Sequence, residues 1–308
     1  MNSQDSPPSQ VDMKVAPSGF REQLLEDYRL ACTSREASLL GRKEVLGGKA
    51  KFGIFGDGKE VAQIALSKVL KPGDWRSGYY RDQTLMMAQG LLTVKQFFAA
   101  LYADTDASRE PSSSGRQMGG HFSSRFLDAE GNWMDQTTQF NSSSDISPTA
   151  GQMPRLLGLA QASKLYRDLP DVAKLKGGFT QGGNEIAVGT IGDASTSEGP
   201  FWETMNAACV LQVPLLMNVW DDGYGISVPK EFQTTKASIS EALRGMEIQQ
   251  GTNGMFIYQV KGWDYPAMVA TYEAAESKCR EQHVPVLVHV EEVTQPQGHS
   301  TSGSHERY

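Results

Sequence analysis

Two acidic turns hold the residues of this chain that are best suited to chemistry. Asp193 closely follows an apolar run at 186–191, and Asp222 closely follows a second apolar run at 213–220. A helix-length stretch lies between them, so the pattern predicts strand, turn, helix and strand. Parallel strands bring both turns to the same edge of a sheet, where ligands bind in open α/β folds. Carboxylates placed there are oxygen ligands for one hard divalent cation, such as Mg²⁺.

Small residues surround the first of these carboxylates. Gly192 precedes Asp193, and Ala194 and Ser195 follow it. They leave room for a phosphate to approach the free N–H groups at the start of the next helix. The two turns together therefore predict a diphosphate bridged by Mg²⁺. Taken alone, the Asp-Asp-Gly-Tyr-Gly sequence at 221–225 also fits an ordinary turn.

The spacing of the two turns resembles the thiamin diphosphate motif, in which Gly-Asp-Gly is followed one crossover later by an Asn-Asn type of turn. The resemblance implies that Asp193, Asp222 and the backbone carbonyl of Tyr224 bind the Mg²⁺ of the cofactor. Two positions depart from the family pattern. Ala194 stands where the motif has its last glycine, and Asp222 stands where the motif has Asn. Asp222 keeps an oxygen ligand but adds a negative charge beside a diphosphate.

The stretch 52–308 as a whole resembles the alpha subunit of the decarboxylating first component of 2-oxo acid dehydrogenase complexes, of the branched-chain or pyruvate type. Besides the paired turns, four segments match in the family's order. They are Gly-Tyr-Tyr-Arg-Asp at 78–82, Gly-Arg-Gln-Met-Gly-Gly-His at 115–121, Ser-Pro-Thr-Ala-Gly-Gln-Met-Pro at 147–154 and Gly-His-Ser-Thr-Ser at 298–302. Each segment is short, and the order and spacing of all of them carry the resemblance.

The resemblance assigns roles to residues of the first and third of these segments. Tyr80 and Arg81 would hold the terminal phosphate of the cofactor, and a planar, permanently charged guanidinium suits a phosphate. Ser147 and Thr149 would position the aminopyrimidine ring through backbone groups. An ordinary surface ion pair between Arg81 and Asp82 is the alternative that the residues alone leave open.

Two of the five histidines lie in Gly- and Ser-rich loops, which are typical positions for catalytic residues. These are His121 and His299, and the resemblance implies that they orient the diphosphate or the substrate and assist proton transfer. His283 and His289 stand in helix-end and strand contexts, and with His305 near the terminus they better fit residues that have no role in the site. Ser300 matches a serine that is phosphorylated in mitochondrial members of the family, and its modification here stays open.

The activity implied by the resemblance is thiamin-diphosphate-dependent oxidative decarboxylation of a 2-oxo acid, followed by acyl transfer to a lipoyl group of an acyltransferase core. The segment 115–118 favours branched-chain 2-oxo acids. A pyruvate or acetoin dehydrogenase alpha subunit, another thiamin enzyme on the same scaffold, and a non-catalytic relative are the alternatives. In this family a beta subunit supplies the glutamate that activates the cofactor, and no segment here resembles that domain. We therefore expect a beta subunit, or a fused beta domain, as partner.

Composition limits the remaining possibilities. The 308 residues, 39% of them hydrophobic, can bury a substantial core. The net charge of −7 argues against nucleic acid and anionic membranes as partners. No apolar run reaches transmembrane length, and the polar N-terminus lacks a signal-peptide pattern. The three cysteines have no metal-binding spacing and suit a reducing compartment, so we expect the cytoplasm, with the mitochondrial matrix as the alternative.

The elements that must position the two turns follow from apolar periodicity. We expect helices at 21–47, 58–70, 83–103, 151–168, after Glu198 and at 265–282, and strands at 186–191, 213–220, 256–260 and 284–290. Alternating strands and helices predict an α/β fold, a parallel sheet with helices on both faces, here of the thiamin-diphosphate-binding type.

The ends of the chain carry two further expectations. Residues 1–20 are rich in Ser, Pro and Gln and predict a disordered tail, which leaves 21–308 as one cofactor-binding domain. Relatives continue with further helices after the loop that contains His299. We therefore expect the C-terminal end at Tyr308 to be truncated, or the chain to be the amino-terminal part of a fused alpha-beta polypeptide. The loop-rich segment 104–141 is long enough to predict a functional loop.

Overall fold

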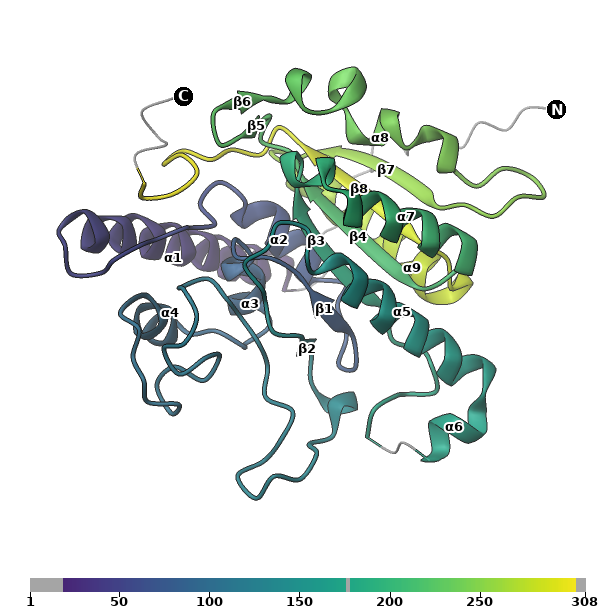
Figure 1. The fold of residues 1–308 in the computed structure, drawn as a ribbon, viewed down its shortest axis with the longest axis horizontal. Coiled ribbons are helices and arrows are strands. Elements are labelled where there is room, and N and C mark those ends of the chain that lie inside the picture. Colours follow the sequence, from purple (N-terminus) through teal and green to yellow (C-terminus); the bar gives the residue numbers. More distant parts are fainter. Residues whose placement is uncertain (1–18, 176–177, 303–308) are drawn as a thin grey trace.

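A parallel sheet forms the centre of the computed structural model, which describes residues 19–175 and 178–302. Within these two ranges the sheet has six strands in the order β2-β1-β3-β4-β8-β7 (Figure 1), and every neighbouring pair is parallel. The strands are β1 Trp75–Ser77, β2 Asn141–Ser142, β3 Ala187–Gly192, β4 Leu215–Trp220, β7 Phe256–Lys261 and β8 Val286–Glu291. The predicted strands are confirmed, with their ends shifted by one or two residues.

Helices cover both faces of this sheet, as predicted. On one face, α2 and α9 pack over the strands, and on the other face α5, α7 and α8 do so (Figure 1). Their bounds are α2 Glu60–Ser67, α9 Tyr265–Gln282, α5 Met153–Asp168, α7 Gly199–Leu211 and α8 Ile239–Ala242. The short helix α6 Pro170–Leu175 follows α5. The α/β class with a doubly covered parallel sheet is therefore confirmed.

Strand β4 shows why both faces of the sheet need helices. Leu216 and Trp220 belong to the core cluster beneath α2 and α9. Leu215 and Met217 belong to the cluster beneath α5 and α7. Because successive side chains point to opposite faces, a strand with apolar side chains on both faces must be covered twice. Burying each large apolar side chain contributes about 1.5–3 kcal/mol, so this central strand anchors the whole sheet.

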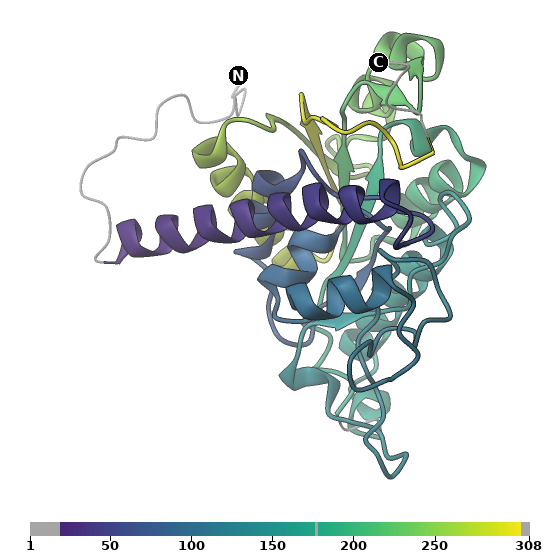
Figure 2. The same ribbon diagram turned by 90° about the vertical axis from the view of Figure 1, so that its left-hand side faces the viewer.

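The long helix α1, Phe20–Leu46, crosses the side of the molecule (Figure 2) and packs against α2, α3 and α4. Its buried face uses small residues, so the neighbouring helices approach closely. A Cβ at Gly41 would lie 2.8 Å from the ring of Phe55. Ser34 and Thr84 share a buried hydrogen bond of 2.7 Å between their hydroxyl groups. Small and polar contacts therefore hold α1 in place, and its large apolar side chains, such as Tyr28, stay exposed.

The single helix predicted at 83–103 is wrong, because the chain forms two helices there. α3 spans Gln83–Ala88 and α4 spans Val94–Leu101. Gly90 between them has a φ of 71°, a left-handed conformation that favours glycine. Thr93 then starts α4 with a capping box, in which its hydroxyl and the side chain of Gln96 exchange hydrogen bonds with each other's backbone N–H.

Two further pairs of strands were not predicted. β1 and β2 contain three and two residues and are largely polar, so no apolar run marks them. The hairpin of β5 Tyr224–Gly225 and β6 Val228–Pro229 is antiparallel and extends from the second acidic turn. Short 3₁₀ turns complete the described segments, at Gln136–Thr138, Ala194–Ser197, Lys230–Phe232, Thr235–Ala237 and Arg244–Met246.

Two expectations concern the ends of the chain. The predicted tail lies outside the described residues up to position 18, and Phe20 already belongs to α1. The positions after 302 also lie outside the description. Among the described helices, none combines the length and the apolar character that crossing a membrane requires.

Candidate active site

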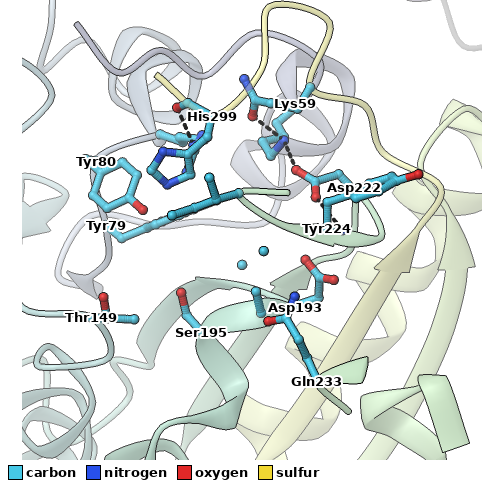
Figure 3. A pocket seen from close by; sticks show the side chains of 16 residues that line it. Lys59, Tyr79, Tyr80, Thr149, Asp193, Ser195, Asp222, Tyr224, Gln233 and His299 are labelled. Atoms are coloured by element: carbon cyan, nitrogen blue, oxygen red, sulfur yellow. Dashed lines mark hydrogen bonds and ion pairs between the residues drawn. The ribbon is translucent and has the colours of Figure 1, made fainter. Parts of the chain in front are cut away.

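A pocket of about 240 Å³ opens at the carboxyl edge of β3 and β4 (Figure 3). The last residues of the two strands, Gly192 and Trp220, are paired, so the acidic turns that follow lie side by side as predicted. Most of the predicted site residues line this pocket, namely Tyr80, Arg81, Thr149, Gly192, Asp193, Ala194, Ser195, Asp222, Tyr224 and His299. The remaining two, His121 and Ser147, do not.

Asp193 presents an unpaired carboxylate oxygen to the pocket. Its backbone N–H donates to the carbonyl of Trp220 at 3.1 Å, which fixes the turn after β3. Its Oδ2 is buried and has no hydrogen-bond partner in the part of the chain that the structure describes. Burial, and then the nearby charges of Asp222 and Asp221, raise the pKa of Asp193 to about 8. An unpartnered buried carboxylate is costly, and a bound cation would remove that cost.

Asp222, the second predicted ligand, is paired with a lysine. Its Oδ2 accepts from Lys59 Nζ at 2.9 Å, and its Oδ1 accepts from the backbone N–H of Tyr224 at 3.2 Å. Lys59 lies directly before α2 and is 2% exposed. Its ammonium group also donates to the Thr294 carbonyl at 2.9 Å and to Gln295 Oε1 at 2.7 Å. Burial lowers the pKa of Lys59, and the charge of Asp222 opposes that effect.

Arg81 connects the pocket to the loop that contains His299. Arg81 Nη2 donates to the backbone carbonyl of His299 at 2.7 Å, and the guanidinium lies 4.9 Å from the centre of the Tyr80 ring. Its Nε is buried and has no partner among the described residues. Burial, and then the charge of Arg81, lower the pKa of His299 to about 4, so its imidazole is neutral at physiological pH. The alternative of a surface ion pair with Asp82 is wrong, because Asp82 binds Arg76 instead.

Asp221 has a different role from Asp222, although the two are adjacent. Its Oδ2 accepts from Lys230 Nζ at 2.8 Å and lies 2.9 Å from His289 Nε2. His289 is fully buried, and its Nδ1 lies 2.9 Å from Ser240 Oγ. Burial disfavours the charge of Asp221, but the bonds from His289 and Lys230 outweigh it and lower its pKa. The contact between Asp221 and the buried His289 therefore holds the second acidic turn in place.

Ala194, which stands where the family motif has glycine, lies opposite a glycine that makes room for its methyl group. A Cβ built on Gly225 would lie 2.8 Å from the Cβ of Ala194, closer than two such atoms can pack. The missing side chain at Gly225 therefore leaves room for the methyl group of Ala194. The predicted helix start after Asp193 is a 3₁₀ turn at Ala194–Ser197, and α7 begins only at Gly199.

His121 and Ser147 contact each other outside the pocket. His121 is buried, with Nδ1 3.1 Å from the Met118 carbonyl and Nε2 2.9 Å from Ser147 Oγ. A carbonyl only accepts, so Nδ1 donates the hydrogen bond to Met118, and Nε2 and the Ser147 hydroxyl share the second hydrogen bond. This bond ties the segment of His121 to the segment that places Thr149 in the pocket. The predicted catalytic role of His121 stays a prediction.

Sequence reasoning missed four polar residues of the pocket, namely Lys59, Tyr79, Gln233 and Gln295. Tyr79 was quoted only as part of a motif, and its buried hydroxyl has no partner within the described ranges. Lys59 and Gln295 line the pocket and contact each other although 236 positions separate them. A lysine in the first turn of a predicted helix is usually solvated, so no local signal could have identified Lys59.

The orphaned polar atoms fit a metal-bound diphosphate. Asp193 Oδ2 is an anionic acceptor without a donor, and Arg81 Nε is a cationic donor without an acceptor. Both belong to residues that line the same pocket. A divalent cation would bind the carboxylate, and a phosphate would bind the guanidinium. The predicted ligand set is therefore chemically suited to Mg²⁺ and a diphosphate.

The comparison with known proteins decides the family. The sequence profile described as "Dehydrogenase E1 component" matches residues 29–308. The chain belongs to this family. The resemblance found in the sequence is thereby confirmed, and it extends over most of the chain.

Curated relatives share this part of their sequence with the chain. The pyruvate dehydrogenase E1 component subunit alpha of Acholeplasma laidlawii is 26% identical over 279 residues, which are 90% of this chain and 66% of the relative. The 2-oxoisovalerate dehydrogenase subunit alpha of Bacillus subtilis is 27% identical over 272 residues, 87% of this chain and 69% of the relative. The mitochondrial 2-oxoisovalerate dehydrogenase subunit alpha 2 of Arabidopsis thaliana is 28% identical over 263 residues, which are 85% of this chain and 47% of the relative. The chain thus spans about half to two thirds of the length of these relatives.

Proposed function

We propose that this chain is the cofactor-binding alpha part of a thiamin-diphosphate-dependent 2-oxo acid dehydrogenase. The observation that carries the proposal is the pocket at the carboxyl edge of β3 and β4, where Asp193 and Arg81 present unpartnered atoms of opposite charge. Membership of the dehydrogenase E1 family supports it. The reaction would be oxidative decarboxylation of a 2-oxo acid with acyl transfer to a lipoyl group.

The substrate that we favour is a branched-chain 2-oxo acid. The segment 115–118 resembles branched-chain enzymes most, and relatives from Bacillus subtilis and Arabidopsis thaliana are 2-oxoisovalerate dehydrogenase subunits. Pyruvate is the alternative, because the relative from Acholeplasma laidlawii is a pyruvate dehydrogenase subunit. Acetoin is a third substrate to assay.

In the proposed reaction the cofactor supplies the chemistry, and residues of the chain bind and orient it. Bound thiamin diphosphate supplies the electron sink for decarboxylation. Asp193, Asp222 and the carbonyl of Tyr224 would hold Mg²⁺, and Tyr80 and Arg81 would bind the diphosphate. Hydrogen bonds from a guanidinium to a phosphate are charge-assisted, so Arg81 would contribute strongly to affinity. Gly192, Ala194 and Ser195 would leave room for the phosphates at the end of β3.

The remaining site residues would orient the reacting groups. Thr149 lines the pocket and would position the aminopyrimidine ring, with Ser147 held beside it by His121. His299 lines the same pocket, and its pKa of about 4 keeps the imidazole neutral. A neutral imidazole can both donate and accept a hydrogen bond, so His299 is suited to move a proton to or from the substrate.

The proposed partners are a beta subunit, or a fused beta domain, and a lipoyl acyltransferase core. The beta part would supply the carboxylate that activates the cofactor, so we expect the chain alone to bind cofactor weakly and to be inactive. The cytoplasm is the proposed compartment, and the mitochondrial matrix is the alternative.

Calorimetric titration with thiamin diphosphate tests this proposal. We expect Mg²⁺-dependent binding, strongest with the beta part present, and its loss by at least about a hundredfold in Asp193→Asn, because the metal loses its charged ligand. Asp168→Asn, at an exposed position on α5, is the matched control and should bind as the unsubstituted chain does.

Two results would overturn parts of this proposal. Cofactor binding that is absent in every condition would leave a non-catalytic relative as the correct interpretation. Equal binding with and without Mg²⁺, or equal binding by Asp193→Asn, would remove the metal assignment. Assays of branched 2-oxo acids, pyruvate and acetoin with the beta part would then rank the substrates by kcat/KM.

A further inference from the structure

We propose that Lys59 and Asp222 act as one electrically neutral unit, which makes the aspartate equivalent to an uncharged ligand of the metal site. The inference rests on the proposed Mg²⁺ diphosphate site. It explains how the chain uses an acidic residue at this position without placing a second unbalanced negative charge beside a diphosphate. Lys59 is accordingly a positioning residue for the cofactor.

The contacts of Lys59 carry the first step. Its ammonium group has three N–H donors and three acceptors, namely Asp222 Oδ2, the Thr294 carbonyl and Gln295 Oε1, at 2.7–2.9 Å. All its hydrogen bonds are therefore satisfied inside the protein, although the side chain is buried. A buried lysine in this state is stable only because a carboxylate lies against it. Figure 3 shows Lys59 reaching toward Asp222 at the side of the pocket.

The charges around the pocket carry the second step. Three aspartates gather at the two acidic turns, and two of them have a basic partner. Asp221 is paired with Lys230, and Asp222 is paired with Lys59. Of these three aspartates, only Asp193 has a buried carboxylate oxygen without a hydrogen-bond partner among the described residues. One unbalanced carboxylate thus remains for a dication, and the diphosphate meets no further net negative charge from these turns.

The backbone around Lys59 carries the third step. Gly58 has a φ of 91° and approaches Thr294 so closely that any Cβ at this position would clash with the Thr294 carbonyl. The same carbonyl accepts from Lys59. The chain then runs from Gln295 to His299, whose carbonyl accepts from Arg81. Lys59 therefore also fixes the start of the loop that contains His299.

A double-mutant cycle tests the neutral unit. The variants are Lys59→Gln, Asp222→Asn and the double variant, each compared with the unsubstituted chain. The first readout is thermal unfolding without cofactor, and the second is calorimetric affinity for thiamin diphosphate with Mg²⁺ and the beta part. Lys261→Gln is the control, because it removes a lysine from a half-exposed ion pair with Glu291 and Glu292.

Each single variant leaves one buried charge unpaired, so we expect its Tm to fall by about 5 °C or more. The double variant carries no charge at either position and should recover most of that loss. For the cofactor, Lys59→Gln should weaken binding by about tenfold or more, because a net negative charge then faces the diphosphate. The double variant should bind within about threefold of the unsubstituted chain. Lys261→Gln should change neither readout appreciably.

Additive losses in the double variant would overturn the proposal, because independent effects exclude a coupled pair. Unchanged Tm in Lys59→Gln would overturn it as well. The Tm cycle needs no cofactor, so it separates this proposal from the proposed function. Strong coupling in Tm, together with no cofactor binding by the unsubstituted chain, would support the buried pair and overturn the thiamin diphosphate site.

Discussion

At the residue scale, Ala194 and Gly225 pack so closely that only one of them can carry a methyl group. Ala194 carries it, and a Cβ on Gly225 would lie 2.8 Å from the Cβ of Ala194. We predict that Gly225→Ala lowers the free energy of unfolding by about 1–3 kcal/mol, the usual cost of an overpacked contact. Urea unfolding of the chain without cofactor measures this change.

The matched control moves the methyl group from one side of the contact to the other. Ala194→Gly combined with Gly225→Ala should recover much of the lost stability, because only one methyl group then occupies the space. Gln233 also borders Gly225, and its flexible side chain can shift. Equal destabilisation by the single and the double variant would show that the two residues do not share this contact.

The residue scale also shows what a sequence can reveal about a site. Asp193, Arg81 and His299 stand in short segments that resemble motifs of one family, and that resemblance predicted that they meet in one pocket. The contact between Lys59 and Asp222 could not be predicted, because 163 positions separate the two residues and no motif around either one indicates the other. Long-range pairing is a product of the folded topology, and a single sequence shows no trace of it.

At the scale of elements, the break between α3 and α4 depends on a cap. Thr93 accepts from the Gln96 N–H, and Gln96 accepts from the Thr93 N–H at 2.8 Å. We predict that Thr93→Ala lowers the free energy of unfolding by about 1 kcal/mol, the typical cost of a lost N-cap. Urea unfolding should show this as a lower midpoint with an unchanged slope.

A conservative change provides the comparison for this cap. Thr93→Ser keeps the hydroxyl that accepts from Gln96 and should retain the stability within about 0.5 kcal/mol. If Thr93→Ser and Thr93→Ala lost the same stability, the cap would not be the reason that α4 begins there.

Elements that are long and apolar could be predicted from the sequence, and short polar ones could not. β4 and β8 are predominantly apolar, and α9 was predicted with its observed ends. β1, by contrast, contains Arg76, whose buried guanidinium binds Asp82 and Asp145. A buried arginine in a three-residue strand is stabilised by ion pairs that only the folded chain supplies.

At the scale of the whole molecule, a buried histidine links stability to pH. Burial, and then the charge of Arg167, lower the pKa of His283 from 6.5 to about 4. Between these values the unfolded chain binds more protons than the folded chain, so stability rises with pH. We predict that the chain loses about 3 kcal/mol through this group as the pH falls from 7 to 4.

His283→Asn isolates this effect. His283 has a φ of 56°, which Asn tolerates, so the substitution should preserve the end of α9. Its lost hydrogen bond to the Gly183 carbonyl lowers stability equally at every pH. Urea unfolding from pH 4 to 7 should therefore show a flatter profile for the variant. Parallel profiles for both proteins would exclude His283 as the source.

The wide separation of the pocket-lining segments has a consequence for biosynthesis. Lys59 and Gln295 bond across 236 positions, and Arg81 reaches His299 across 218. Contacts between residues so far apart in the sequence form late, because closing a long loop costs conformational entropy. During translation the early helices emerge long before their partners near β8, so we expect the ligand pocket to form late. We therefore expect ligand affinity to appear only after the segment that follows β8 has been synthesised and has packed against the helices near the start of the chain.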